Sequence, residues 1–153
     1  MTRAACLVLA MLAAPASASS ADAIVERLDA CLGAVGAPGA HPEQCMGLHA
    51  EPCMERAEGQ TTYGMVTCLS EETAAWDEIL NREYKALVAA LDPAQTEALR
   101  EAQRAWLDFR DADCAFPHVF VEGSLARPWG ADCVMQHTAR RAVELRGYRD
   151  FLE

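Results

Sequence analysis

The sequence predicts an all-α fold: a small disulfide-linked helical bundle built on an antiparallel helix hairpin plus a C-terminal helix. Three observations predict it. Apolar residues recur at the helical period of about 3.6 residues through two long segments, 62–91 and 131–152. Between them, Asp92-Pro93-Ala94-Gln95 combines the end of one helix with the start of another. Six cysteines follow an N-terminal segment that is typical of exported proteins, in which disulfides are stable.

The first residues have the pattern of an export signal. Thr2-Arg3 is basic, the run from Ala4 to Ala14 is apolar, and Ala16-Ser17-Ala18 is a cleavage site of small residues. We therefore expect residues 1–21 to be a signal peptide, cleaved near Ala18 or Ala21, and the protein to be periplasmic or secreted. The apolar run is too short to span a bilayer, so we expect no membrane span.

Cysteine usage points to cross-links. Cys6 would leave with the signal peptide, and the remaining cysteines form an even set, which predicts three disulfides in an oxidising compartment. Spacing alone leaves every pairing of this set open. The set consists of Cys31, Cys45, Cys53, Cys68, Cys114 and Cys133.

Length and charge restrict the organisation and the partners. Residues 22–153 are enough for a single domain with a buried core. The formal net charge of −10 disfavours nucleic acid and anionic lipid as partners and favours a cationic one.

The N-terminal part of this domain, residues 22–61, is expected to be irregular and rich in Cys, Gly and Pro. It begins with a short helix from Asp22 to Leu32, which Gly33 ends. The glycines and prolines that follow prevent regular secondary structure from stabilising the segment, so we expect disulfide cross-links to hold it.

Within this segment His41, Cys45, His49 and Cys53 lie four residues apart, as metal ligands on one helical face would. Gly47 and Pro52 interrupt such a helix, and ligands strung along it could not surround one ion. We therefore interpret the cysteines as disulfide halves and expect no metal and no other cofactor. One alternative is a Cu(I) site, which needs reduced thiols; its ligands would be Cys45, Met46, His49, Cys53 and Met54.

The rest of the chain predicts three helices and a loop. The first helix covers 62–91, the second starts at Pro93 and runs to about Phe116, and the last covers 131–152. The loop 117–130 is more apolar than a solvated connection needs to be, so we expect it to pack over the bundle. Apolar or partly apolar stripes mark the first and last helices: Met65, Leu69, Trp76, Leu80, Leu87 and Leu91, then Val134, Thr138, Arg141, Leu145, Tyr148 and Leu152.

Polar residues also share the apolar face of the second helix. Gln103 and Arg110 share a face with Leu99 and Trp106, and a guanidinium is costly to bury unless it is paired. We expect an internal polar network that fixes helix register; the alternative is an anion pocket formed by Arg110 and Arg141. The expected network consists of Asp77, Asn81, Gln103, Arg110, Thr138 and Arg141.

No catalytic constellation is apparent in the sequence: it has no phosphate loop, nucleophile elbow or HExxH motif. The acids Glu71-Glu72 and Asp77-Glu78 are interpreted as a solvated helix face. We expect no catalytic residues and a protein that is not an enzyme.

A longer pattern runs through the three helices. It reads Met65-x2-Cys68-x7-Trp76-Asp77-x3-Asn81-x2-Tyr84, then Leu99-x3-Gln103-x2-Trp106-x3-Arg110-Asp111-x2-Cys114, then Cys133-x4-Thr138-x2-Arg141-x3-Leu145. This pattern resembles the LprI-type lysozyme-inhibitor family of exported bacterial proteins, over about Cys53 to Tyr148. The resemblance implies a small helical, disulfide-linked domain outside the cytoplasm, with inhibition of lysozyme as its named activity. It further implies the pairs Cys114–Cys133, Cys53–Cys68 and Cys31–Cys45.

These expectations lead to a functional hypothesis. The protein would bind a protein partner, such as lysozyme or a related cationic cell-wall hydrolase, and cover its substrate cleft. The expected contact surface is Glu122 and Ser124 with Asp132, because loops on rigid scaffolds commonly carry binding groups. The alternative is an extracytoplasmic structural or assembly partner without inhibitory activity; an enzyme or a copper carrier ranks below both.

Overall fold

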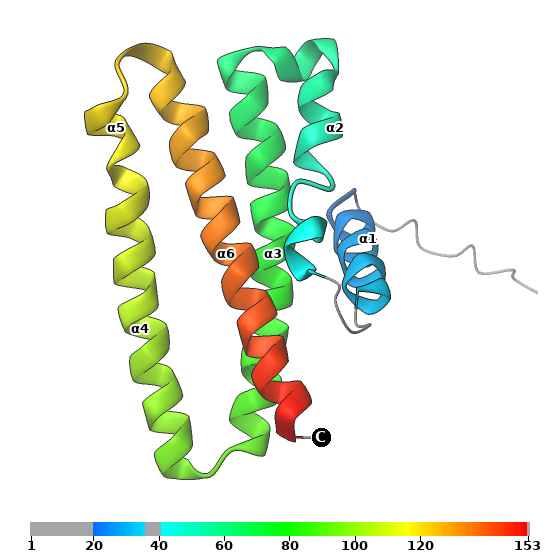
Figure 1. Ribbon diagram of the computed structural model, residues 1–153, viewed down its shortest axis with the longest axis vertical. Helices are drawn as coiled ribbons and strands as arrows, with labels where there is room; N and C mark the ends of the chain where they lie inside the picture. The colour runs from blue at the N-terminus through cyan, green and yellow to red at the C-terminus, as the bar shows by residue number, and fades with distance from the viewer. Residues whose placement is uncertain (1–19, 36–40, 153) are drawn as a thin grey trace, which may run out of the picture.

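The predicted all-α class is confirmed by the computed structural model, which describes residues 20–35 and 41–152 and contains no strand within them (Figure 1). The predicted signal peptide, residues 1–21, falls almost entirely outside this part of the chain. The elements in order are α1 (Ser20–Ala34), η1 (Pro42–Cys45), α2 (Ala50–Glu55), η2 (Ala57–Gln60), α3 (Thr62–Ala90), α4 (Pro93–Ala115), α5 (Pro117–Phe120), η3 (Gly123–Leu125) and α6 (Ala126–Leu152).

None of the helices in the described ranges combines the length and the apolar content that crossing a membrane requires.

The two helices of the hairpin begin at well-formed caps. The Thr61 side chain accepts a hydrogen bond from the Gly64 N–H at 3.0 Å and starts α3. Asp92 and Gln95 form the predicted capping box: the Gln95 N–H donates to the Asp92 carboxylate at 2.9 Å, and the Asp92 N–H donates to the Gln95 side chain at 3.0 Å. These bonds explain why a connection as short as Leu91-Asp92 suffices between α3 and α4.

The core lies mainly between α3 and α6, and α1 covers another side of α3 (Figure 1). Trp76, Ile79 and Leu145 have no exposed surface, nor does Leu28 of α1. Although α4 follows α3 directly in the chain, its main contacts are with α6, so the two hairpin helices do not form the principal interface. Among the described residues, one flank of α4 therefore has no helix packed closely against it.

The last helix starts earlier than expected, at Ala126 instead of residue 131. Pro128 lies in its first turn, where the missing N–H costs no intrahelical bond. The expected loop 117–130 is therefore wrong as a single irregular segment, because it contains the short helices α5 and η3 as well as the first turn of α6.

Three disulfides connect consecutive parts of the chain. Cys31–Cys45 joins α1 to η1, Cys53–Cys68 joins α2 to α3, and Cys114–Cys133 joins α4 to α6. These pairs agree with those implied by the family resemblance. Cys45 and Cys53 belong to different disulfides and different helices, so the four-residue spacing in 41–53 does not lie on one helical face.

Glu72 is the most consequential buried residue of α3. Its side chain is 0 % exposed, and its carboxylate accepts the backbone N–H groups of Gly47 (2.7 Å), His49 (2.9 Å) and Ala50 (2.7 Å) and the indole N–H of Trp76 (3.0 Å). Gly47 has a φ of +86°, a conformation that other residues rarely adopt. The sequence interpretation of Glu72 as part of a solvated face is wrong, because the turn before α2 supplies the donors that replace water.

A second buried acid connects three helices. Glu83 is 1 % exposed and lies 2.7 Å from Arg149 of α6 and 3.2 Å from the neighbouring Arg82. Arg82 in turn binds Asp29 of α1 at 2.6 Å, and this hydrogen bond is the main reason that the pKa of Arg82 is raised. The cluster fixes the positions of α1 and α6 on α3.

Replacing Glu72 by alanine should destabilise the fold strongly. The substitution leaves four donors without their acceptor, and we expect the free energy of unfolding to fall by about 3–5 kcal/mol in urea denaturation with the disulfides intact. Glu71→Ala is the matched control, because the adjacent acid is exposed and only pairs with His49 at 2.8 Å; its cost should stay below about 1 kcal/mol. Equal costs for the two substitutions would contradict this assignment.

Removing the Cys114–Cys133 disulfide should loosen α4 selectively. We expect Cys114→Ala with Cys133→Ala to lower the free energy of unfolding by about 3 kcal/mol and to accelerate amide hydrogen exchange in α4, which has few other contacts. Cys31→Ala with Cys45→Ala removes a loop of similar length, with a separation of 14 instead of 19 residues, and should leave exchange in α4 unchanged. Unchanged α4 exchange in the first variant would show that the disulfide does not hold this helix.

Candidate functional site

α5 and the start of α6 lie at one end of the molecule (Figure 1). Together with η3 between them, they carry large apolar side chains that are exposed. Val119 is 85 %, Phe120 67 % and Trp129 56 % exposed. The expectation that the loop packs over the bundle is therefore wrong for these side chains. We call this region the end surface and define it by Phe116, Val119, Phe120, Leu125 and Trp129.

Local contacts hold the end surface in shape. The rings of Phe116 and Phe120 stack with centroids 5.5 Å apart. The Thr62 hydroxyl donates to Ser124 at 3.4 Å, which joins η3 to the start of α3. The His118 ring lies so close to Gly130 that a Cβ there would come within 2.7 Å of its Nε2. With the Cys114–Cys133 disulfide nearby, these contacts order the loop before any partner arrives.

The three residues expected to contact a partner all lie at this end. Glu122, Ser124 and Asp132 are exposed, and Glu122 immediately precedes η3. Although Asp132 is exposed, partial desolvation of its carboxyl group raises its pKa above the ordinary value, against a hydrogen bond with Gln136 and the charge of Arg140. The exposed aromatics of this end were not predicted from the sequence, because an apolar loop without periodicity gives no sign of which way its side chains face.

The end surface has the chemistry of a protein interface. Exposed aromatic and aliphatic side chains lie beside acidic ones, as at the apolar centre and polar rim of many interaction sites. Several exposed apolar side chains on a cross-linked end favour recognition of a partner over chemistry on a small substrate.

Five of the six residues expected to form an internal network line an open groove between α3 and α4, to which α6 also contributes; Arg141, the sixth, is bonded to Gln103 of this groove. Thr138 and Arg141 are buried, whereas Asp77 and Asn81 are exposed. The interior interpretation is therefore wrong for Asp77 and Asn81, because the unpacked flank of α4 leaves them open to solvent.

Hydrogen bonds join these residues in separate pairs instead of one network. The Asn81 amide donates to the Asp77 carboxylate at 2.9 Å. Arg141 donates to Gln103 at 2.9 Å, which joins α6 to α4. The Thr138 hydroxyl donates to the Val134 carbonyl within its own helix.

The two arginines considered for an anion pocket already have anionic partners. Arg110 donates twice to the Asp111 carboxylate, at 3.0 and 2.8 Å, with its guanidinium 5.1 Å from the centre of the Trp106 ring. Arg141 binds Glu144 at 2.7 Å. Burial acts to raise the pKa of Glu144, but hydrogen bonds from Tyr148 and Arg141 outweigh it and the net shift is downward. Neither guanidinium offers an unpaired charge to a bound anion.

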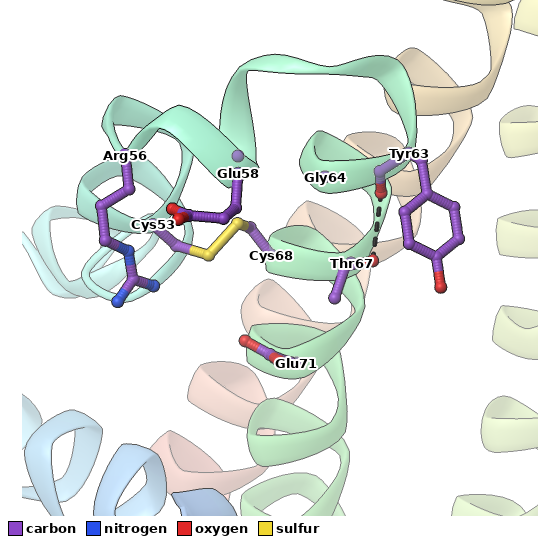
Figure 2. Close-up of a pocket in the computed structure, with 9 residues that line it drawn as sticks. Cys53, Arg56, Glu58, Tyr63, Gly64, Thr67, Cys68 and Glu71 are labelled. Atoms are coloured by element: carbon purple, nitrogen blue, oxygen red, sulfur yellow. Dashed lines mark hydrogen bonds between the residues drawn. A yellow bond between two sulfur atoms is a disulfide. The ribbon is translucent and has the colours of Figure 1, made fainter.

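Two groups of possible metal ligands occur in the described residues, and disulfides disable both. One consists of Asp113, Cys114, Cys133 and His137, the other of His49, Cys53 and Glu71. Each cysteine in them is bonded to another sulfur, so it cannot act as a thiolate. Figure 2 shows the second group's Cys53–Cys68 disulfide between α2 and α3, above Glu71 in a shallow hollow, with Tyr63 pointing away from it.

Comparison with known proteins supports the resemblance noted in the sequence. A family model described as "Lysozyme inhibitor LprI" matches residues 53–145. The chain is 28 % identical over 110 residues to "Uncharacterized protein R02472" of Rhizobium meliloti (strain 1021), an alignment that covers 63 % of this chain and 78 % of that protein. No solved structure matches the chain.

The matched region runs from α2 to α6 and contains the groove, the end surface and two of the disulfides, but not α1 or η1. Because this match spans more than half of the chain, the protein belongs to the LprI family of lysozyme inhibitors.

Proposed function

We propose that this protein is an exported inhibitor that blocks a cationic cell-wall hydrolase of lysozyme type by seating its end surface in the substrate cleft. The observation that carries the proposal is the exposure of Val119, Phe120 and Trp129 on an end held by a disulfide, inside the region that matches the family. Exposed apolar side chains suit burial in a partner's cleft, whereas the groove between α3 and α4 does not present a protrusion.

The energetics favour this end as the anchor. Each large apolar side chain that moves from water into a partner contributes about 1.5–3 kcal/mol. Because the stack of Phe116 on Phe120 and the contacts of His118 and Ser124 already order the segment, little conformational entropy is lost on binding.

Charge would accelerate the encounter. The formal net charge of −10 attracts a cationic partner over a distance set by ionic strength. Glu122 and Asp132 place acidic groups beside the apolar anchors, so the attraction also orients the two proteins.

The proposal includes the site of action. Three disulfides suit an oxidising compartment outside the cytoplasm, and the basic, apolar and small-residue pattern of 1–21 suits a signal peptide that directs residues 22–153 there as a single domain.

Truncating the anchors should weaken inhibition. In a turbidity assay with a basic lysozyme and bacterial cells, we expect Trp129→Ala and Phe120→Ala each to raise the inhibition constant roughly tenfold or more, the effect of losing an interface hot spot of about 2 kcal/mol. Phe151→Ala is the control, because Phe151 is 90 % exposed near the C-terminal end of α6, far from the end surface.

Two outcomes would reject the proposal. One is undiminished lysis at a large molar excess of the unsubstituted protein and low salt. The other is inhibition that survives both anchor substitutions. If a co-purified partner is bound without any loss of its activity, the alternative role as an extracytoplasmic assembly partner replaces inhibition.

Removing the acidic rim should slow association. We expect Glu122→Gln with Asp132→Asn to lower the association rate constant several-fold at low salt, measured by stopped flow, with the difference disappearing as salt screens the charges. Glu101→Gln with Asp108→Asn removes the same charge from exposed positions on α4 and should slow association less. Equal slowing by both double variants would assign the effect to net charge and not to the rim.

A further inference from the structure

The groove between α3 and α4 is a second surface with its own chemistry. Two hollows of about 410 and 420 Å³ follow one another along it and share Asp77. One is bounded by Asn81, Tyr84, Gln103 and Trp106, and the other reaches Arg110 and Thr138. The proposed inhibitory role does not use this surface.

The groove does not favour an anion. Arg100 and Arg104 lie 3.5 and 3.4 Å from Glu97, and Arg110 lies 2.8 Å from Asp111. Within the described ranges no ion pair joins Asp77 to a cation. Arg100 and Arg104 share the single carboxylate of Glu97, so the three guanidinium groups are balanced by Glu97, Asp111 and Asp77. The groove therefore offers a negatively charged ligand no net positive charge.

Several groups in the groove are available for hydrogen bonding. In the part of the chain that the structure describes, the Tyr84 hydroxyl and the Trp106 indole N–H have no hydrogen-bond partner. The Gln103 side chain accepts from Arg141 through its oxygen, which leaves its N–H groups without a hydrogen-bond partner among the described residues. Asn81 donates to Asp77 and keeps its amide oxygen as an acceptor.

We propose that this groove binds a neutral oligosaccharide. Sugar rings carry hydroxyl groups at their edges and C–H groups on their faces, and the groove sets planar polar side chains, Asp77, Asn81 and Gln103, beside the aromatic rings of Tyr84 and Trp106. Such an alternation satisfies both parts of a sugar without an ionic contact.

An extended peptide suits the groove less well. The walls are helices, whose backbone N–H and C=O groups bond within the same helix. A peptide laid along them would find no strand edge to pair with its own backbone. A sugar has no such continuous row of backbone groups to satisfy.

The length of the groove indicates a chain of sugars instead of a single ring. Its α3 wall runs from Ser70 to Tyr84, which at 1.5 Å per residue is about 21 Å.

The test is an NMR titration of the isotope-labelled, oxidised protein with chitotetraose, a neutral oligosaccharide, and separately with tetragalacturonate, an anionic one. We expect saturable shifts from chitotetraose at the Asn81 side-chain amide and the Trp106 indole N–H, and weaker binding of tetragalacturonate. Asn81→Ala and Tyr84→Phe should each raise the dissociation constant at least fivefold. Gln44→Ala removes an exposed amide from η1, away from the groove, and should leave the constant unchanged.

Three results would overturn the proposal: no saturable shift from chitotetraose, shifts confined to the end surface, or tighter binding of tetragalacturonate. Failure here leaves the inhibitory role intact, because Asn81 and Tyr84 lie outside the end surface and their substitution should not alter lysis in the turbidity assay.

Discussion

The fold depends on one buried carboxylate. Glu72 projects from α3 and accepts the backbone N–H groups of Gly47 and His49 in the turn before α2 and of Ala50, its first residue. It also accepts the indole N–H of the fully buried Trp76. A charge without water is tolerated only when its acceptor sites are filled, and here the donors come from a segment 22 to 25 residues earlier in the chain. This contact fixes where α2 begins, and so positions the Cys53–Cys68 disulfide and the η1 segment that carries Cys45.

The packing of α3 explains why one flank of α4 is left open. α3 packs against α6 on one side and against α1 and α2 on others. Its buried side chains therefore lie mainly against these helices, and few pack against α4. α4 is held at its start by the short Leu91-Asp92 connection and near its end by Cys114–Cys133, with Gln103 bonded to Arg141 between them. The groove along one flank and the apolar end surface beyond the disulfide both follow from this arrangement.

The sequence predicted those features that local periodicity and capping encode. The extents of α3 and α4, the capping box at Asp92 and the helical class all follow from spacing along the chain, and the pairing of the disulfides followed from the family resemblance. Glu72 could not be identified, because a glutamate beside an exposed Glu71 has the same local pattern whether its acceptors face water or a distant turn. The periodicity of Gln103 and Arg110 along α4 does not indicate what that face contacts, because the same spacing occurs whether α4 packs on α3 or leaves a groove. The outward orientation of Phe120 and Trp129 depends on tertiary placement, which composition does not report.

Amide hydrogen exchange at Gly47, His49 and Ala50 tests the central role of Glu72 most directly. If the carboxylate holds these three N–H groups as described, they should exchange only through global unfolding, with the same opening free energy as the most protected amides of α3. Exchange of the three amides at the rate of an exposed turn, while α3 stays protected, would show that the turn is not anchored to Glu72 and would contradict this account of the fold.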